Sequence, residues 1–205
     1  DKAIELLDRF HGCATGVFTG DEHLSGKNPS QGTELCAVVE YMFSLEMLAS
    51  CFGGTAYADR LESLAYNNLP GAFTADMWAH QYDQQANQVQ CTVEKRDWTN
   101  GPDANIYGLM PNYKCCTGNF SQGWPKFVSH MWMGTPDSGL AAIAYGPSEV
   151  RRMIGTAQVN VTEKTDYPFS GEIEFEVRTS GSTTFPLHLR IPAWAGGAKV
   201  SVNGG

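Results

Sequence analysis

The chain has 205 residues, 42% of them hydrophobic, and a formal net charge of −8. This hydrophobic content is sufficient for a folded core, which excludes an intrinsically disordered protein. An acidic chain without a basic stripe has little electrostatic attraction for nucleic acid or an anionic membrane, so we expect neither as a partner and favour a neutral polar substrate.

The sequence shows neither a membrane span, nor a signal peptide, nor a disulfide scaffold. No apolar run approaches the roughly 20 residues of a membrane span, and the first residues do not resemble a signal peptide. The six cysteines are too irregularly spaced for a disulfide scaffold. Reduced cysteines favour a cytoplasmic location, while periplasmic and secreted locations stay open.

Both ends of the chain predict a piece of a larger protein. Residues 1–10 carry apolar residues at helical spacing, which predicts a buried helix face that needs partners earlier in the chain. Residues 199–202 alternate like a strand and run into Asn203-Gly204, a strong hairpin signal with no returning strand after it. We therefore expect the isolated chain to be poorly soluble.

Helices are predicted between these ends. The segment from Glu34 to Cys51 is apolar almost all round, which predicts a helix buried in a helical assembly and ended by Gly53-Gly54. A second helix follows and ends before Pro70-Gly71. A third has apolar residues at helical spacing from Trp124 to Trp132, with Pro125 in its first turn.

Two segments lack helical periodicity. Residues 78–89 are rich in amides and are either extended or a solvated loop; the amides resemble a lining for hydroxyl groups. Residues 94–111 predict an irregular surface loop. From Leu140 on, the period becomes that of strands, with apolar and polar residues alternating over 173–177 and 187–191. This pattern predicts an antiparallel β-domain with one face in water.

The cysteine motifs carry the strongest chemical signal. Cys115 and Cys116 are adjacent, and the planar peptide between neighbours opposes a disulfide within the pair. With Glu34 and Cys36 they form a four-ligand set that Zn²⁺ accepts. The alternatives are that they are small buried core residues, as we expect for Cys51, or that the pair forms a reversible vicinal disulfide.

Four motifs, in the same order along the chain, resemble the β-L-arabinofuranosidase family, glycoside hydrolase family 127 and its relatives. They are Thr33-Glu34-Leu35-Cys36-Ala37-Val38-Val39-Glu40, the segment 77–89, Cys115-Cys116-Thr117 with Gln122-Gly123-Trp124-Pro125-Lys126-Phe127, and Leu189-Arg190-Ile191-Pro192-Ala193-Trp194. The resemblance implies an α+β multidomain fold. Residues 1–138 would be the C-terminal part of an (α/α)6 catalytic barrel, and residues 139–205 the truncated start of an antiparallel β-sandwich.

The resemblance also implies a retaining glycoside hydrolase that acts on an arabinofuranoside or a related glycan. In such an enzyme Glu34, Cys36, Cys115 and Cys116 bind Zn²⁺, and Cys115 is also the nucleophile. Glu22 matches the family's general acid/base. The spacing from Glu22 to Glu34 is shorter than the family's, which keeps Asp21 as the alternative.

Four further side chains are predicted to contact sugar hydroxyls or, alternatively, to pack in the core: His80, Tyr82, Gln84 and Tyr113. Two other functions stay open. A structural zinc protein would have the same ligands in a closed site. A carbohydrate-binding or assembly module would need an exposed aromatic platform, for which Trp194 is the candidate.

Overall fold

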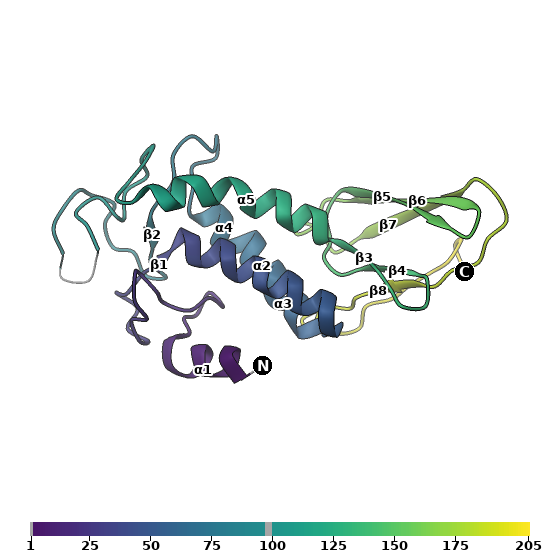
Figure 1. The fold of residues 1–205 in the computed structure, drawn as a ribbon, viewed down its shortest axis with the longest axis horizontal. Coiled ribbons are helices and arrows are strands. Elements are labelled where there is room, and N and C mark those ends of the chain that lie inside the picture. The colour runs from purple at the N-terminus through teal and green to yellow at the C-terminus, as the bar shows by residue number, and fades with distance from the viewer. Residues whose placement is uncertain (1, 97–99) are drawn as a thin grey trace. The chain divides into compact units, whose positions relative to one another are not determined.

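The computed structural model describes residues 2–96 and 100–205 and divides into two compact units. The first unit comprises Asp1–Met47 and Arg60–Phe127, and the second comprises Leu48–Asp59 and Val128–Gly205. Figure 1 shows the order of helices and strands along the chain. Helices therefore dominate the described part of the first unit, and strands that of the second.

The first two predicted helices form. Helix α1 spans Lys2–His11, and none of its residues is buried. Helix α2 spans Leu35–Phe52. It ends at Gly53, which has a φ of 67°, a conformation that glycine adopts without steric cost. Near the end of α2, Cys51 is exposed, so the prediction that it is a core residue is wrong.

By length and composition α2 is long and apolar enough to cross a membrane, contrary to the prediction that no segment approaches that length. This is weak evidence for a span, because the core helix of a globular protein passes the same test. Val38, Val39 and Leu45 of α2 are at most 1% exposed. Burial within the protein therefore accounts for part of the apolar character of α2.

The second predicted helix is a composite. Helix α3 spans Thr55–Ser63, a π-helical turn η1 spans Leu64–Asn68, and the short α4 spans Leu69–Gly71. Pro70 lies in the first turn of α4, where its missing N–H has no helical partner to lose.

The third helix is longer than predicted. Helix α5 spans Lys114–His130, so it begins ten residues before Trp124 and contains the cysteine pair. Pro125 lies inside α5, and its predicted place in the first turn is wrong. Phe127 of α5 makes edge contacts with Tyr66 and Trp124, at ring-centroid distances of 5.6 and 5.9 Å. The contact with Tyr66, which lies in η1, anchors α5 in the core of the first unit.

The segment between the second and third helices is mostly irregular. Strand β1, Thr33–Glu34, pairs in antiparallel register with β2, Asp83–Gln84. The described residues of the 94–111 loop lack regular structure, as predicted, yet Ala104 and Asn105 are at most 2% exposed. This loop is therefore not a surface loop along its whole length.

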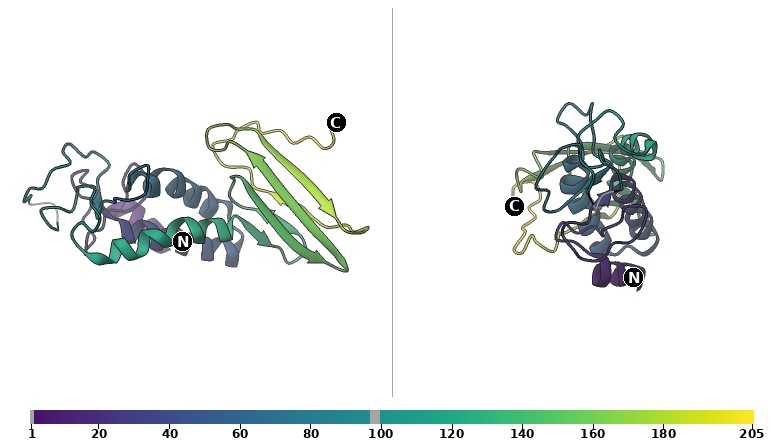
Figure 2. Two further views of the ribbon diagram at one scale, coloured as in Figure 1. Left: turned by 90° about the horizontal axis from the view of Figure 1, so that it is seen from above. Right: turned by 90° about the vertical axis from the view of Figure 1, so that its left-hand side faces the viewer.

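Two small sheets form the β-part of the second unit (Figure 2). One contains β3, Trp132–Gly134, β4, Leu140–Ala142, and β8, Leu187–Leu189, in the order β3-β4-β8. The other contains β5, Ser148–Ile154, β6, Ala157–Thr165, and β7, Ile173–Thr179, in the order β5-β6-β7 and antiparallel throughout.

Two β predictions need correction. Strands β4 and β8 pair in parallel, so the domain is not purely antiparallel. Residues 199–202 form no strand, and Val200 and Val202 are exposed. The alternation of apolar and polar residues is not sufficient for a strand, because a strand also needs a partner to pair with. The predicted turn is present, because Asn203 and Gly204 both have positive φ, 52° and 81°.

The core of the second unit contains Leu140, Ile154, Val159 and Val161, with Trp132 and Phe175 among the side chains packed against it. Burial alternates along β6, which gives that strand one wet face as predicted. The described chain is therefore a mixed helix-and-sheet protein, in agreement with the α+β prediction.

A buried ion pair ties α3 to the second unit's strands. The Arg190 side chain, 3% exposed, donates to the Asp59 carboxylate, and Asp59 Oδ2 also accepts the Ala193 N–H at 3.2 Å. The Arg190 guanidinium lies 5.7 Å from the ring centroid of Trp194. Trp194 is thus packed against Arg190 although half-exposed.

Removing one partner of this pair should destabilise the second unit strongly. We expect Asp59→Ala to lower the free energy of unfolding by about 3–5 kcal/mol, because it leaves the Arg190 charge buried without its carboxylate. Urea denaturation followed by circular dichroism measures this loss. The control is Glu149→Ala, which breaks an exposed pair with Arg151 and should change little. Equal effects of the two substitutions would contradict the prediction.

Candidate functional site

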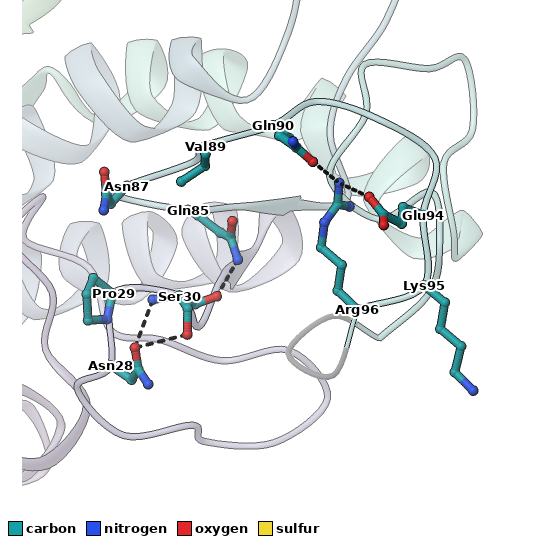
Figure 3. A pocket seen from close by; sticks show the side chains of 10 residues that line it. All are labelled: Asn28, Pro29, Ser30, Gln85, Asn87, Val89, Gln90, Glu94, Lys95 and Arg96. Carbon is teal, nitrogen blue, oxygen red and sulfur yellow. Dashed lines mark hydrogen bonds and ion pairs between the residues drawn. The ribbon is translucent and has the colours of Figure 1, made fainter.

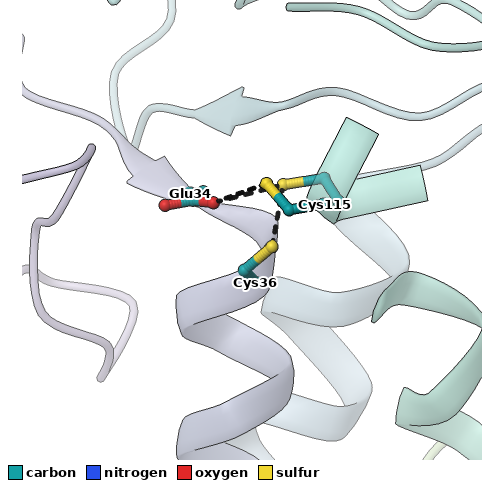
Figure 4. Close-up of side chains that lie close together, drawn as sticks. Glu34, Cys36 and Cys115 are labelled. Carbon is teal, nitrogen blue, oxygen red and sulfur yellow. Dashed lines mark hydrogen bonds between the residues drawn. The ribbon is translucent and has the colours of Figure 1, made fainter. Parts of the chain in front are cut away.

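Three elements of the first unit converge on the predicted metal ligands (Figure 4). Glu34 is the last residue of β1, Cys36 lies in the first turn of α2, and Cys115 and Cys116 lie in the first turn of α5. The Leu35 N–H donates to the Tyr82 carbonyl oxygen at 2.8 Å. This bond extends the β1–β2 pairing to the first residue of α2 and fixes where that helix begins.

The four side chains form a compact cluster. Their potential ligand atoms all lie within 4.8 Å of one another. Glu34 Oε1 lies 3.2 Å from Cys115 Sγ and 3.7 Å from Cys116 Sγ, and the sulfurs of Cys36 and Cys116 are 3.4 Å apart. Sulfurs bound to one tetrahedral zinc ion at about 2.3 Å would be roughly 3.8 Å apart. The cluster therefore has the size and the donor atoms of a zinc site.

Exposure differs within the cluster. Cys116 is buried, Glu34 and Cys36 are half-buried, and Cys115 is exposed. Both helices present their N-termini here, where the helix dipole favours a negative charge. Cys115 is thus the sulfur that an external molecule can reach most easily.

The thiols influence one another's ionisation. The hydrogen bond with Cys116 lowers the pKa of Cys36 and raises the pKa of Cys116. Partial desolvation of the sulfur, and then the hydrogen bond to Glu34, raises the pKa of Cys115 to about 12. Ionisation of Cys115 near neutral pH therefore needs additional positive charge. A divalent cation bound by these three thiols and one carboxylate fits that need.

His80 supports the first turn of α5. Its Nε2 lies 2.9 Å from Thr117 Oγ1, its Nδ1 lies 2.9 Å from the Gln81 carbonyl oxygen, and its ring stacks on Phe120 at 5.3 Å. Because Nδ1 must donate to the carbonyl, Nε2 of the neutral ring accepts the Thr117 hydroxyl. His80 is 2% exposed, and its predicted sugar contact stays a prediction.

A hydrogen-bond network holds the predicted acid/base. The Tyr82 hydroxyl donates to Glu22 Oε1 at 2.9 Å and lies 3.3 Å from Asn100 Nδ2. The Tyr82 side chain is fully buried, and burial raises its pKa well above the usual range. Tyr82 therefore remains a hydrogen-bond donor at any physiological pH.

Glu22 and its neighbour differ in environment. Glu22 is exposed and has a φ of 60°, a left-handed conformation that is uncommon for this residue type. Asp21 is 5% exposed, and its Oδ2 accepts the Asn100 backbone N–H at 3.0 Å. Burial raises the pKa of Asp21. The structure keeps both candidates within one network.

The two remaining predicted sugar contacts are placed differently. Gln84 donates through Nε2 to the Asn68 carbonyl oxygen at 2.9 Å, so one of its two amide donors is used within the protein. Tyr113 is 49% exposed and makes an edge contact with the Tyr82 ring at 5.6 Å. Only Tyr113 of this pair presents a large free surface, and both assignments stay predictions.

Asp83 belongs to none of the predicted site residues. It is fully buried opposite Glu34, and neither of its carboxylate oxygens has a hydrogen-bond partner among the described residues. Burial, followed by the charges of Asp21 and Glu34, raises its pKa to about 8. A Cβ on Gly32 would lie 1.9 Å from Asp83 Oδ1. In the sequence, Gly32 before the E-x-C motif indicates a close approach of some other group to the backbone. The sequence does not show that this group is the Asp83 carboxylate.

Comparison with known proteins covers both units. Residues 11–129 match the family model described as the β-L-arabinofuranosidase GH127 catalytic domain, and residues 139–205 match the GH127 middle domain. No curated protein matches the chain.

Solved structures share the fold at low sequence identity. A GH127 β-L-arabinofuranosidase from Geobacillus stearothermophilus T6 is 19% identical with a TM-score of 0.73, over 93% of this chain and 31% of that chain. A GH127 β-arabinofuranosidase is 20% identical with a TM-score of 0.66, over 88% and 27%. A structure described as a glycoside hydrolase is 18% identical with a TM-score of 0.74, over 93% and 35%.

The chain thus spans about a third of the length of these structures. The catalytic-domain match covers more than half of the chain and includes all four clustered ligands. This chain belongs to the β-L-arabinofuranosidase family GH127.

Proposed function

We propose that this chain is part of a retaining glycoside hydrolase of the β-L-arabinofuranosidase type. The observation that carries the proposal is the convergence of three thiols and one carboxylate at two helix N-termini. The fold likeness to GH127 structures supports the assignment of residues 1–138 to an (α/α)6 barrel and of residues 139–205 to a β-sandwich. Its substrate would be an arabinofuranoside or a related glycan.

The proposed metal is Zn²⁺, held by Glu34, Cys36, Cys115 and Cys116. When bound, zinc supplies positive charge that keeps thiols ionised at neutral pH. Cys116 is buried and Cys36 half-buried, which suits them to purely structural roles as ligands. Cys115 is exposed and sits at the N-terminus of α5, which suits it to act on a substrate as well.

Cys115 is the proposed nucleophile. Its sulfur attacks the anomeric carbon and forms a C–S bond while the bond to the leaving oxygen breaks. Glu22 donates a proton to that oxygen. In the second half, water attacks the same carbon, Glu22 accepts the water proton, and the C–S bond breaks to regenerate the thiolate. The configuration at the anomeric carbon is retained because it is inverted twice.

The hydrogen bond from Tyr82 supports the role of Glu22. A buried donor bound to one carboxylate oxygen leaves the other oxygen to exchange a proton with the substrate. Asp21 is the alternative acid, because burial raises its pKa, as a general acid requires. Tyr113, next to Tyr82, offers an exposed aromatic face for contact with the sugar.

The structural zinc protein is the second candidate. One observation favours it: four protein side chains gather in the cluster, and structural zinc sites have four protein ligands without an open position. The exposure of Cys115 favours catalysis instead.

The zinc site predicts the metal content of the purified protein. We expect about one zinc ion per chain. Cys36→Ser should weaken zinc affinity more than tenfold, because even partners outside the ligand set contribute about 10- to 100-fold. Mass spectrometry of metals after dialysis against a weak chelator measures both. Cys51→Ser, at an exposed cysteine, is the control. Unchanged zinc retention in Cys36→Ser would refute the assigned ligand set.

Cys115→Ser should abolish catalysis while the fold is retained. The expected loss in turnover of an aryl β-L-arabinofuranoside is roughly 10⁴-fold or more, because a missing nucleophile cannot be bypassed. Circular dichroism should stay unchanged, and Cys13→Ser should be active. A Cys115→Ser protein within tenfold of the wild-type rate would instead support the structural zinc protein.

The acid/base role predicts an effect that depends on the leaving group. Glu22→Gln should slow hydrolysis of an alkyl arabinofuranoside by about 10²–10⁴-fold, the usual contribution of general acid catalysis. The loss should be smaller with a nitrophenyl leaving group, which needs less proton assistance in the first step. Asp21→Asn is the matched comparison. If only Asp21→Asn shows this dependence, Asp21 is the acid and the assignment to Glu22 is wrong.

A further inference from the structure

A cavity of about 580 Å³ lies in the first unit (Figure 3). The loop 28–30 lines one part of it, and the segment 85–96 contributes the other described residues of the lining. Its volume is within the range of about 300–1,000 Å³ typical of small-molecule sites. The mechanism described above does not use this cavity.

The chain that leaves β2, the strand paired with Glu34, runs directly into the lining of this cavity. Asp83 pairs with Glu34, and Gln85 follows two residues later. At about 3.3 Å per residue this step is roughly 7 Å along the strand. Gln85 Nε2 donates to the Ser30 carbonyl oxygen, so this bond joins the two loops. One wall of the cavity therefore continues from the strand that lies against Glu34.

The lining is rich in side-chain amides. Asn87 has no side-chain hydrogen bond in the described part of the protein, and its amide offers both donors and an acceptor. Gln85 uses its nitrogen on Ser30 and keeps its oxygen available. A sugar hydroxyl both donates and accepts, so amides are suited to bind it. Val89, 85% exposed, adds an apolar surface for the C–H groups of a sugar ring.

Arg96 is the buried cation of the cavity lining, and its guanidinium already has hydrogen-bond partners within the protein. The Arg96 guanidinium is bonded to Thr92 Oγ1 at 2.6 Å and to the Thr92 carbonyl oxygen at 3.1 Å, and it lies 3.4 Å from Glu94 Oε2. Its side chain is 9% exposed. Lys95 is the remaining cation of the lining. The amides therefore favour a neutral polyhydroxylated ligand over an anion.

The same segment borders a second cavity. This cavity, of about 410 Å³, shares Gln85, Val89 and Gln90 with the first, and Gln81, Gln84 and Gln88 also line it. Two cavities along one amide-rich segment provide binding surface for more than one sugar residue.

We propose that the 580 Å³ cavity binds a neutral sugar residue of an oligosaccharide whose cleaved residue lies at the Glu34–Cys115 cluster. This inference rests on the proposed function, because it places the cavity on the leaving-group side of the same substrate. It assigns the amides of residues 85–90 a role in selecting oligosaccharides over single sugars.

Binding measured without turnover tests the cavity separately from catalysis. The protein carrying Cys115→Ser is titrated calorimetrically with an L-arabinofuranose trisaccharide and with methyl β-L-arabinofuranoside. Asn87→Ala and Val89→Trp are then introduced, the second to fill the cavity. Gln158→Ala, at an exposed amide of β6, is the matched control.

Asn87→Ala should weaken trisaccharide binding about fivefold, as expected for one net hydrogen bond, and Val89→Trp should weaken it further. Binding of the methyl glycoside should be unchanged in both, and Gln158→Ala should change neither ligand. The proposal is overturned if both variants bind the trisaccharide as tightly as the parent, or if the parent binds it no more tightly than the methyl glycoside. If trisaccharide binding responds to Asn87→Ala but the protein with Cys115 intact does not hydrolyse these ligands, the cavity is supported and the catalytic assignment is refuted.

Discussion

The candidate centre depends on a two-residue antiparallel pairing, Thr33–Glu34 against Asp83–Gln84. This pairing places Glu34 immediately before α2, so that Cys36 enters the first helical turn. Next to β2, the Tyr82 carbonyl oxygen accepts the Leu35 N–H and lies 3.8 Å from Cys116 Sγ. The Tyr82 hydroxyl, at the other end of the same residue, holds Glu22. Tyr82 therefore couples the position of the thiol cluster to that of the acid/base candidate.

The pairing also forces like charges together. Asp83 is buried opposite Glu34, and the charges of Asp21 and Glu34 contribute to raising its pKa to about 8. Asp83 is consequently mostly protonated at neutral pH, which limits the electrostatic cost of burying it. Glu34 further raises the pKa of Cys115. Positive charge at the cluster would relieve the repulsion among several of these groups at once, which is why the donor set and the electrostatics point to the same kind of ligand.

Sequence reasoning succeeded where the signal was local. The apolar run of α2, the glycine at its end and the E-x-C and Cys-Cys motifs lie within short segments, and each predicts its own structure or chemistry. It failed where partners come from distant segments. The start of α5 was missed because Lys114–Gln122 is polar and has little helical periodicity, and Asp83 could not be identified because its importance arises from burial opposite Glu34. The parallel β4–β8 pair likewise requires a partner far along the chain.

The nucleophile and acid candidates are held in different ways. Cys115 lies at the start of a helix anchored by Phe127, and a Cβ at Gly123 would lie only 2.7 Å from Leu69, so α5 packs closely on the core. The position of Cys115 is therefore set by the packing of α5 on the core. Glu22 lies in an irregular segment with a φ of 60° and is held through its hydrogen bond with Tyr82. The fixed position of the Cys115 sulfur suits a nucleophile, because attack on carbon needs a defined trajectory. The position of Glu22 on a loop suits an acid/base, because its carboxyl group must reach first the leaving oxygen and then a water molecule.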